Sequence, residues 1–152
     1  MTSTASFLCT VLRVSAAAMV LAGGFIHYRI WQQQYKDLPA PVPGRWVVRT
    51  GFPVNAAASL VLALALIAVG LPALARLRRL VVVGALAFEI GSIAVLVTTR
   101  SRSVFGWLEK GDWGTNPTRT IRVEIVTVAA LLAVFVFDRA RPRRDQPVPN
   151  RL

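Results

Sequence analysis

The chain alternates between four long apolar runs and shorter polar stretches. The runs cover about residues 7–28, 53–74, 80–99 and 121–137. Each is close to the roughly 20 residues that an α-helix needs to cross the hydrocarbon core of a bilayer. Because the connections are too short for a second core, the pattern predicts one all-α membrane domain over residues 1–138, with four transmembrane helices in an antiparallel bundle.

Two basic segments give a prediction of orientation. Residues 139–152 form a tail rich in arginine and proline, which we expect to be disordered and close to phospholipid head groups. The connection Ala75–Arg79 (ARLRR) holds three arginines in five residues. Because basic connections stay in the cytoplasm, both segments predict a multi-pass protein of the cell membrane with cytoplasmic N- and C-termini.

The two long connections combine helix-breaking residues with aromatic ones. Pro39, Pro41, Pro43 and Gly44 interrupt any helix after the first run, and Pro53 suits the first position of the second helix. Tryptophan and tyrosine favour the head-group level of a bilayer. Trp31, Tyr35 and Trp46 are therefore expected to be interfacial anchors, and the predicted orientation places all four tryptophans, Trp31, Trp46, Trp107 and Trp113, on the outer side.

The first run also contains small residues, AAAMVLAGG, that fit the cleavage site of a secretory signal peptide. The apolar run continues through Phe25 and Ile26, which favours a helix that is retained. A lipoprotein signal is not favoured, because Leu8 precedes Cys9 at a position that requires a small residue.

Composition supports a membrane protein and argues against several kinds of site. Charged residues make up 16% of the chain, against roughly 25% in soluble domains. The net charge of +11 comes from basic residues that flank apolar runs, so the lipid bilayer and not nucleic acid is the expected partner. With Cys9 as the only cysteine and His27 as the only histidine, we expect no disulfide, no metal site and no cofactor.

Glu89 is the only charged residue in the run 80–99 and lies near its middle. An ionised carboxylate at that depth costs several kcal/mol. Arg13 is the obvious cation, but it lies about two turns off in depth, where its long side chain can either reach the head groups or extend inward. We therefore expect a protonated Glu89 that faces the bundle interior or a partner helix and donates a hydrogen bond to a neighbouring span.

Three polar residues, His27, Asn55 and Glu124, fall at a similar depth near the ends of three different runs. In an antiparallel bundle these ends meet, and a carboxylate that faced lipid would be costly. We expect the three side chains to form a polar cluster, with Arg29 or Arg122 as the partner of the carboxylate. The cluster would either stabilise the packing of the helices or form a functional site.

One face of the run 80–99 carries small residues at helical spacing, namely Gly84, Ala87, Gly91 and Ala94. Small residues let neighbouring helices approach closely. This helix is therefore expected to be central in the bundle and to offer a face for other membrane proteins or for a second copy of the chain.

A set of short motifs is spread over most of the chain, from Gly23 to about Leu132. They are His27 and Trp31, then Tyr35, Lys36 and Pro39, then FPVNA at 52–56, FGWLE at 105–109 and Glu124. In this order they resemble a loosely defined group of short four-helix actinobacterial membrane proteins of unassigned function. The resemblance implies the four-helix architecture and no reaction. The present chain has a longer first connection, with PAPVPGRW inserted.

An enzyme is not favoured, because the sequence lacks a nucleotide-binding loop, a pair of intramembrane aspartates and a histidine dyad. The leading hypothesis is a structural or accessory subunit that packs against other membrane proteins. The alternative is a small carrier or proton-linked transporter that uses Glu89 with His27 and Glu124. A lipid- or quinone-linked membrane enzyme is the third hypothesis.

Overall fold

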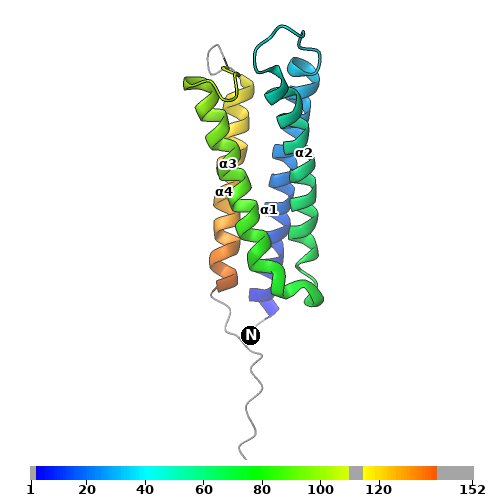
Figure 1. Ribbon diagram of the computed structural model, residues 1–152. Helices are drawn as coiled ribbons and strands as arrows, with labels where there is room; N and C mark the ends of the chain where they lie inside the picture. The colour runs from blue at the N-terminus through cyan, green and yellow to red at the C-terminus, as the bar shows by residue number, and fades with distance from the viewer. Residues whose placement is uncertain (1–2, 110–114, 140–152) are drawn as a thin grey trace, which may run out of the picture.

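The computed structural model describes residues 3–109 and 115–139, and every secondary-structure element within them is a helix (Figure 1). The four long helices are α1 (Ser3–Ile30), α2 (Arg45–Ala68), α3 (Arg78–Ser101) and α4 (Thr115–Arg139). A π-helix, η1 (Trp31–Tyr35), continues α1, and a 3₁₀ helix, η2 (Pro72–Leu77), precedes α3. Each long helix contains a segment long and apolar enough to cross a membrane, so the four-helix prediction is confirmed.

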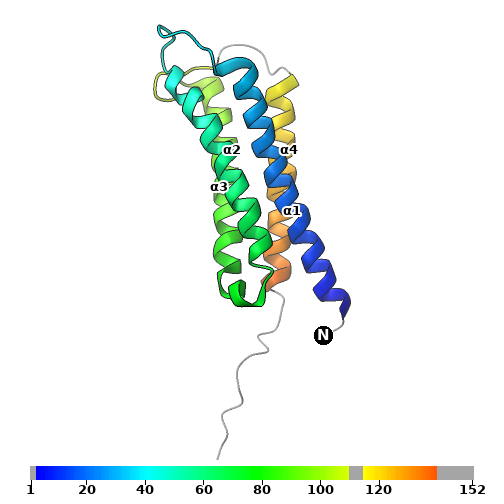
Figure 2. The ribbon, with the colours of Figure 1, turned by 90° about the vertical axis from the view of Figure 1, so that its right-hand side faces the viewer.

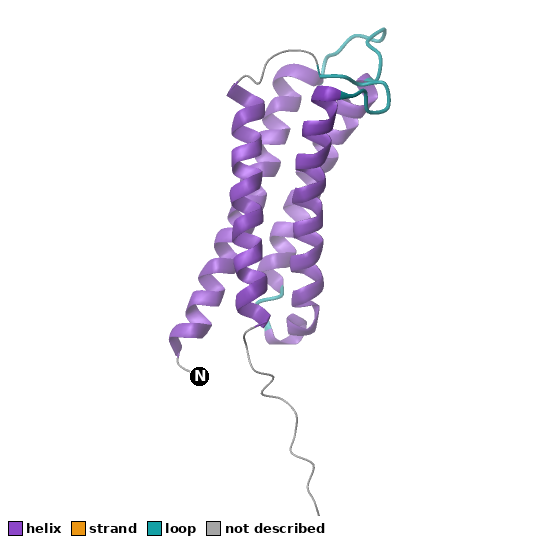
Figure 3. Ribbon diagram, turned by 90° about the vertical axis from the view of Figure 1, so that its left-hand side faces the viewer, coloured by secondary structure: helices purple, strands orange, loops and turns teal. Residues whose placement is uncertain are grey.

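Successive long helices run in opposite directions, which gives the bundle two different ends (Figures 1 and 2). The start of α1, the α2–α3 connection and the end of α4 lie at one end, which we call the terminal end. The loops 36–44 and 102–109 lie at the other, the loop end (Figure 3). The basic tail expected at 139–152 lies, apart from Arg139, outside the described residues.

The central helix is α1, which packs extensively against both α2 and α4. α3 packs mainly against α4. Its contact with α2 is much smaller than the contact between α1 and α2. The expectation that residues 80–99 form the central helix is therefore wrong. The physical reason is that Gly84 and Gly91 lie on an open face, where an added Cβ atom would meet nothing within 4 Å.

α2 begins at Arg45, so Pro53 lies inside the helix and not at its start as expected. Gly44, in a left-handed conformation with φ of 67°, ends the preceding loop immediately before the helix. A proline in a membrane helix removes one backbone hydrogen bond but is tolerated there. The glycine, and not the proline, therefore sets the start of α2.

The connection between α2 and α3 is more ordered than the sequence suggested. Leu71 has an extended backbone with ψ of 140°, as residues before a proline prefer, and η2 follows at once. Arg78 and Arg79 form the first turn of α3. The ARLRR segment is thus not a loop, because its first part belongs to η2 and its last part to α3.

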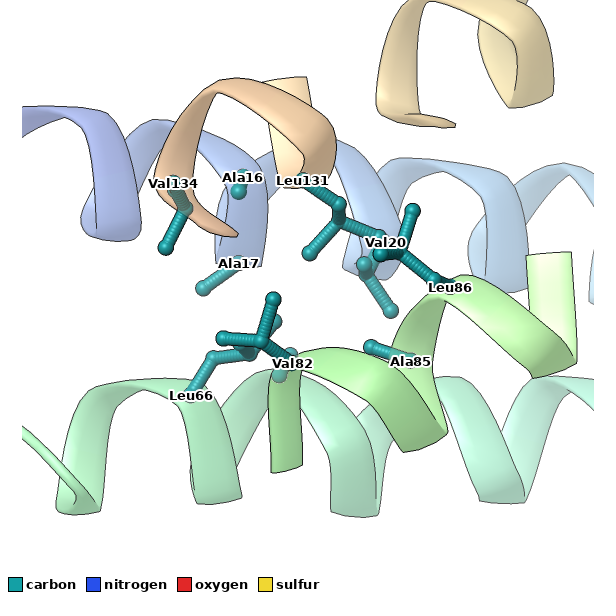
Figure 4. Packing of buried hydrophobic residues seen from close by; sticks show 10 residues of the cluster. Ala16, Ala17, Val20, Leu66, Val82, Ala85, Leu86, Leu131 and Val134 are labelled. Carbon is teal, nitrogen blue, oxygen red and sulfur yellow. The ribbon is translucent and has the colours of Figure 1, made fainter. Parts of the chain in front are cut away.

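A cluster of buried aliphatic side chains holds the four helices together (Figure 4). The labelled members are Ala16, Ala17 and Val20 of α1, Leu66 of α2, Val82, Ala85 and Leu86 of α3, and Leu131 and Val134 of α4. Large apolar side chains such as Leu60, Leu80 and Val136 are exposed on the outer surface. An outer surface of this kind fits a hydrocarbon environment and not water.

The packing of α1 on α2 yields a prediction at two adjacent glycines. A Cβ atom at Gly24 would lie 2.5 Å from Ser59 Cβ, whereas one at Gly23 would meet nothing within 4 Å. Gly24→Ala should therefore separate the helices and lower the free energy of unfolding by about 1–3 kcal/mol. Gly23→Ala is the matched control and should be neutral or stabilising, because alanine favours a helix. Thermal unfolding in detergent measures both variants, and equal midpoints would contradict the close approach.

Candidate functional site

A chain of hydrogen bonds joins all four long helices. His27 Nε2 of α1 lies 3.0 Å from Glu124 Oε1 of α4, and Ser92 Oγ of α3 donates to the same oxygen at 2.6 Å. Asn55 Nδ2 of α2 donates to Ser92 Oγ at 3.2 Å. Ser59 Oγ in turn donates to Asn55 Oδ1 at 3.5 Å. We call His27, Asn55, Ser92 and Glu124 the polar network.

Two members of the polar network are buried, and the other two, Asn55 and Ser92, are half-buried. Glu124 is 1% exposed and His27 is 7% exposed. In a low-dielectric surrounding, a buried carboxyl group is stable only where donors or a cation satisfy it. Glu124 Oε1 has two such partners, but Glu124 Oε2 is buried without a hydrogen-bond partner among the described residues. The network therefore retains one unused acceptor.

The structure brings together the three residues that the sequence placed at matched depth, and it adds Ser92 as the link between them. The expected role of Arg29 or Arg122 is wrong, because both side chains are exposed and His27 and Ser92 contact the carboxyl group instead. An arginine near a helix end can extend into the head-group region, whereas the shorter His27 and Ser92 side chains stay within the bundle.

Glu89 faces the bundle interior and is only 3% exposed. It precedes Ser92 by one turn of α3, and it lies close enough to Glu124 for the two charges to repel one another. The expected hydrogen bond to a neighbouring span is not formed, since the Glu89 carboxyl has no hydrogen-bond partner within residues 3–109 and 115–139. Glu89 therefore borders the polar network without joining it.

Arg13 lies far from this group and takes part in a second ionic contact at the terminal end. Its Nη2 atom is 3.7 Å from Asp138 Oδ1, and Arg78 Nη1 is 4.0 Å from the same oxygen. Arg13 is buried, so its side chain extends inward instead of reaching the head groups. The reason is that α4 extends beyond the apolar run and carries Asp138 to the depth of Arg13.

A cavity of about 870 Å³ adjoins the polar network at the loop end. His27, Asn55 and Ser92 contribute to its wall, and most of the remaining wall is apolar and comes from α2 and α3. Val54 of α2 and Val95 of α3 line the cavity, yet they are 59% and 52% exposed. The cavity is therefore open sideways between α2 and α3, toward the surface that the other exposed apolar residues share.

Aromatic residues and Glu109 cover the loop end of the cavity. Tyr35 Oη and Trp107 Nε1 both donate to Glu109 Oε2 at 3.0 Å, and the Glu109 backbone N–H donates to Thr99 O at 2.9 Å. The Tyr35 ring lies 4.9 Å from Phe52 and 5.7 Å from Trp107, measured between centroids. We call Tyr35, Phe52, Trp107 and Glu109 the cap.

The prediction that Tyr35 is an interfacial anchor is wrong. Tyr35 is buried and hydrogen-bonded to Glu109, so it is not an exposed anchor at the head groups. Trp46 is exposed, in keeping with the interfacial position expected for it, and its ring lies 5.7 Å from that of the exposed Phe105, measured between centroids. Trp113 lies outside the described residues. No pattern in the sequence indicated the cap, because its members come from segments that no helical period connects.

The wall of the cavity has a mixed chemical composition. Among the described residues, no three histidine, cysteine, aspartate or glutamate side chains lie close enough together to hold a metal ion. The site combines hydrogen-bonding groups, aromatic rings and an apolar wall, which is the composition of a pocket for an organic ligand.

The polar network predicts a difference between two substitutions of Glu124. Glu124→Leu removes the acceptor of His27 and Ser92 and should lower the free energy of unfolding by about 1–3 kcal/mol for each group left without a partner. Glu124→Gln keeps an acceptor oxygen and should cost much less. Val126→Leu, an exposed position of α4, is the control. Thermal unfolding in detergent measures all three variants, and similar midpoints for Glu124→Leu and Glu124→Gln would show that the network does not stabilise the bundle.

No family model matches this sequence, and neither a curated protein nor a solved structure matches it. The chain's assignment as a membrane protein therefore rests on its four long apolar helices.

Proposed function

We propose that this membrane protein binds an amphipathic molecule of the isoprenoid quinone class within the bilayer. The observation that carries the proposal is the cavity of about 870 Å³ that is open sideways between α2 and α3 and has three members of the polar network in its wall. Binding pockets for small molecules have volumes of about 300–1,000 Å³ and combine apolar walls with a few polar groups. The cavity meets both criteria.

The chemistry of the wall supports a planar head group with an apolar chain. Phe52, Tyr35 and Trp107 offer ring surfaces on which a planar head group can stack. Asn55 and His27 offer hydrogen bonds to the oxygens of a quinone or quinol. The sideways opening lets a chain of isoprene units extend between α2 and α3 into the lipid. A water-soluble ligand has no apolar chain that could occupy this opening.

The motifs that carry the resemblance to the actinobacterial group also converge on this site. His27 and Glu124 belong to the polar network, FPVNA supplies Phe52 and Asn55, and FGWLE supplies Trp107 and Glu109. Residues that are far apart in the sequence thus lie around one cavity. This convergence supports the proposed site.

The second candidate function is the accessory subunit that the sequence favoured. The observation in its favour is the open face of α3, where Gly84, Ala87, Gly91 and Ala94 are all exposed. Such a face permits close packing of a helix from another protein or from a second copy. The face and the cavity overlap at Ala87 and Gly91, which also line the cavity.

The residues required by the proton-linked carrier hypothesis lie in the same half of the bundle. His27, Glu89 and Glu124 are all buried there, and the two carboxyl groups interact electrostatically. A carrier needs each of its titrating groups to reach water in some state. His27 lines the cavity but Glu89 does not, so ligand binding requires fewer assumptions than transport.

Two glycines on one face of α3 provide the test of ligand binding. Gly91 lines the cavity and Gly84 does not, and neither position has an atom within 4 Å of an added Cβ. Gly91→Leu should fill the cavity and weaken binding of a short-chain quinone at least about tenfold, or about 1.4 kcal/mol. Gly84→Leu should leave the affinity unchanged. Quenching of tryptophan fluorescence reports the binding, because Trp107 lies in the cavity wall.

The same two variants separate the candidate functions. If Gly91→Leu leaves quinone affinity unchanged, the ligand proposal is wrong. If Gly84→Leu and Gly91→Leu both release a co-purifying membrane protein or a second copy while quinone does not bind, the accessory subunit is the function.

We further propose that the terminal end of the bundle is cytoplasmic in the cell membrane. The concentration of arginine near the α2–α3 connection and the end of α4 supports this orientation, since basic residues stay on the cytoplasmic side. The measurement uses a Cys9→Ala background with single cysteines at the exposed positions Ala40 and Ala75. A membrane-impermeant maleimide should label Ala40→Cys in intact cells and Ala75→Cys only after permeabilisation. The reverse pattern would overturn the orientation.

A further inference from the structure

A second cavity lies at the terminal end, opposite the proposed quinone site, and has a volume of about 370 Å³. It lies between the region where α3 begins and the last turn of α4. Its wall contains four guanidinium groups and one carboxylate, together with the Phe135 ring: the charged residues are Arg76, Arg78, Arg79, Arg139 and Asp138. The arginines therefore come from two segments that are far apart in the sequence.

The positive charge of this cavity exceeds its negative charge. Asp138 already lies within 4.0 Å of Arg78, and the buried Arg13 approaches it from α1 at 3.7 Å. Within the described ranges, no acidic side chain forms an ion pair with Arg76, Arg79 or Arg139. A surplus of guanidinium groups around a concave site attracts an anion.

The arginines suit this cavity to a phosphate group. Guanidinium groups bind phosphate oxygens through pairs of parallel N–H bonds, and the Arg139 guanidinium lies over the Phe135 ring at 4.5 Å from its centroid. η2 runs directly into α3, and the Arg78 N–H donates to Ala75 O. The guanidinium groups, and not the start of α3, therefore provide the donors of this cavity.

We infer that this cavity binds the phosphate group of an anionic ligand, either an anionic phospholipid or a soluble phosphate compound. The position at the end of the bundle is level with lipid head groups if the four helices cross the bilayer, and the half-buried Phe135 ring provides an apolar surface for an acyl chain or a sugar. The site does not depend on the quinone proposal, because the two cavities share no lining residue.

The test compares lipid binding to the full-length protein in detergent by native mass spectrometry. Phosphatidylglycerol, phosphatidylcholine and inorganic phosphate are offered separately. The wild-type protein should retain phosphatidylglycerol over phosphatidylcholine, and the double variant Arg76→Gln/Arg79→Gln should bind it at least tenfold more weakly. Arg78 is left intact because it also donates to Val69 O.

The control is the double variant Arg29→Gln/Arg49→Gln, which removes the same charge from exposed positions outside both cavities. It should change binding less than twofold. A single Arg139→Lys variant keeps the charge but loses the paired N–H bonds, and it should bind with intermediate affinity. Because these substitutions lie at the surface, thermal midpoints near that of the wild type should accompany them.

The possible results either support the phosphate site or overturn it. Binding of inorganic phosphate without phosphatidylglycerol supports the site and assigns it to a soluble ligand. Equal retention of both phospholipids, or equal losses in the Arg76/Arg79 and Arg29/Arg49 variants, overturns it. Unchanged phosphatidylglycerol binding in the Arg76/Arg79 variant also overturns it, since the arginines within 140–152 would then account for the attraction.

Discussion

The arrangement of the loop-end half depends on satisfying one buried carboxyl group in an apolar medium. Glu124 is enclosed by the bundle, and water in the hydrocarbon core cannot compensate for a missing partner. His27 and Ser92 provide donors from two other helices, and Asn55 connects the fourth through Ser92. The hydrogen bonds therefore specify which helices meet and at what depth. Aliphatic packing alone would not, because lipid tails are as apolar as the core residues.

The same requirement explains why a cavity exists beside the network. α1 packs closely on α2 where Gly24 meets Ser59, and it also packs on α4. The Ser92–Glu124 hydrogen bond links α3 to α4, and the Asn55–Ser92 hydrogen bond links α3 to α2. α3 nevertheless packs less extensively against α2 than against α4. The cap closes the loop end of the resulting gap, but no described part of the chain closes its side. A bundle organised around Glu124 thus leaves an opening between α2 and α3.

The sequence predicted the helices well because the bilayer imposes their length and hydropathy. It also predicted that the acid, the histidine and the asparagine of the polar network would meet, since residues of equal depth come together in an antiparallel bundle. The sequence predictions failed where the hydropathy pattern does not determine the path of the chain. Pro53 was taken as a helix start, although a membrane helix tolerates proline in its interior. The Arg13–Asp138 contact was missed because α4 continues past the apolar run, and the Tyr35–Glu109 contact depends on loop paths that no periodicity encodes.

The two ends of the bundle differ in charge, and the ligands proposed for them differ accordingly. At the loop end, His27 is the one basic group in direct contact with Glu124 within the described ranges. The cavity wall there also contains one arginine and one glutamate, Arg100 and Glu109. An uncharged head group would add no further charge to this wall. At the terminal end, four guanidinium groups face one carboxylate, and an anion reduces their mutual repulsion. The proposed ligands of the two cavities therefore differ in charge, with an uncharged head group at the loop end and a phosphate at the terminal end.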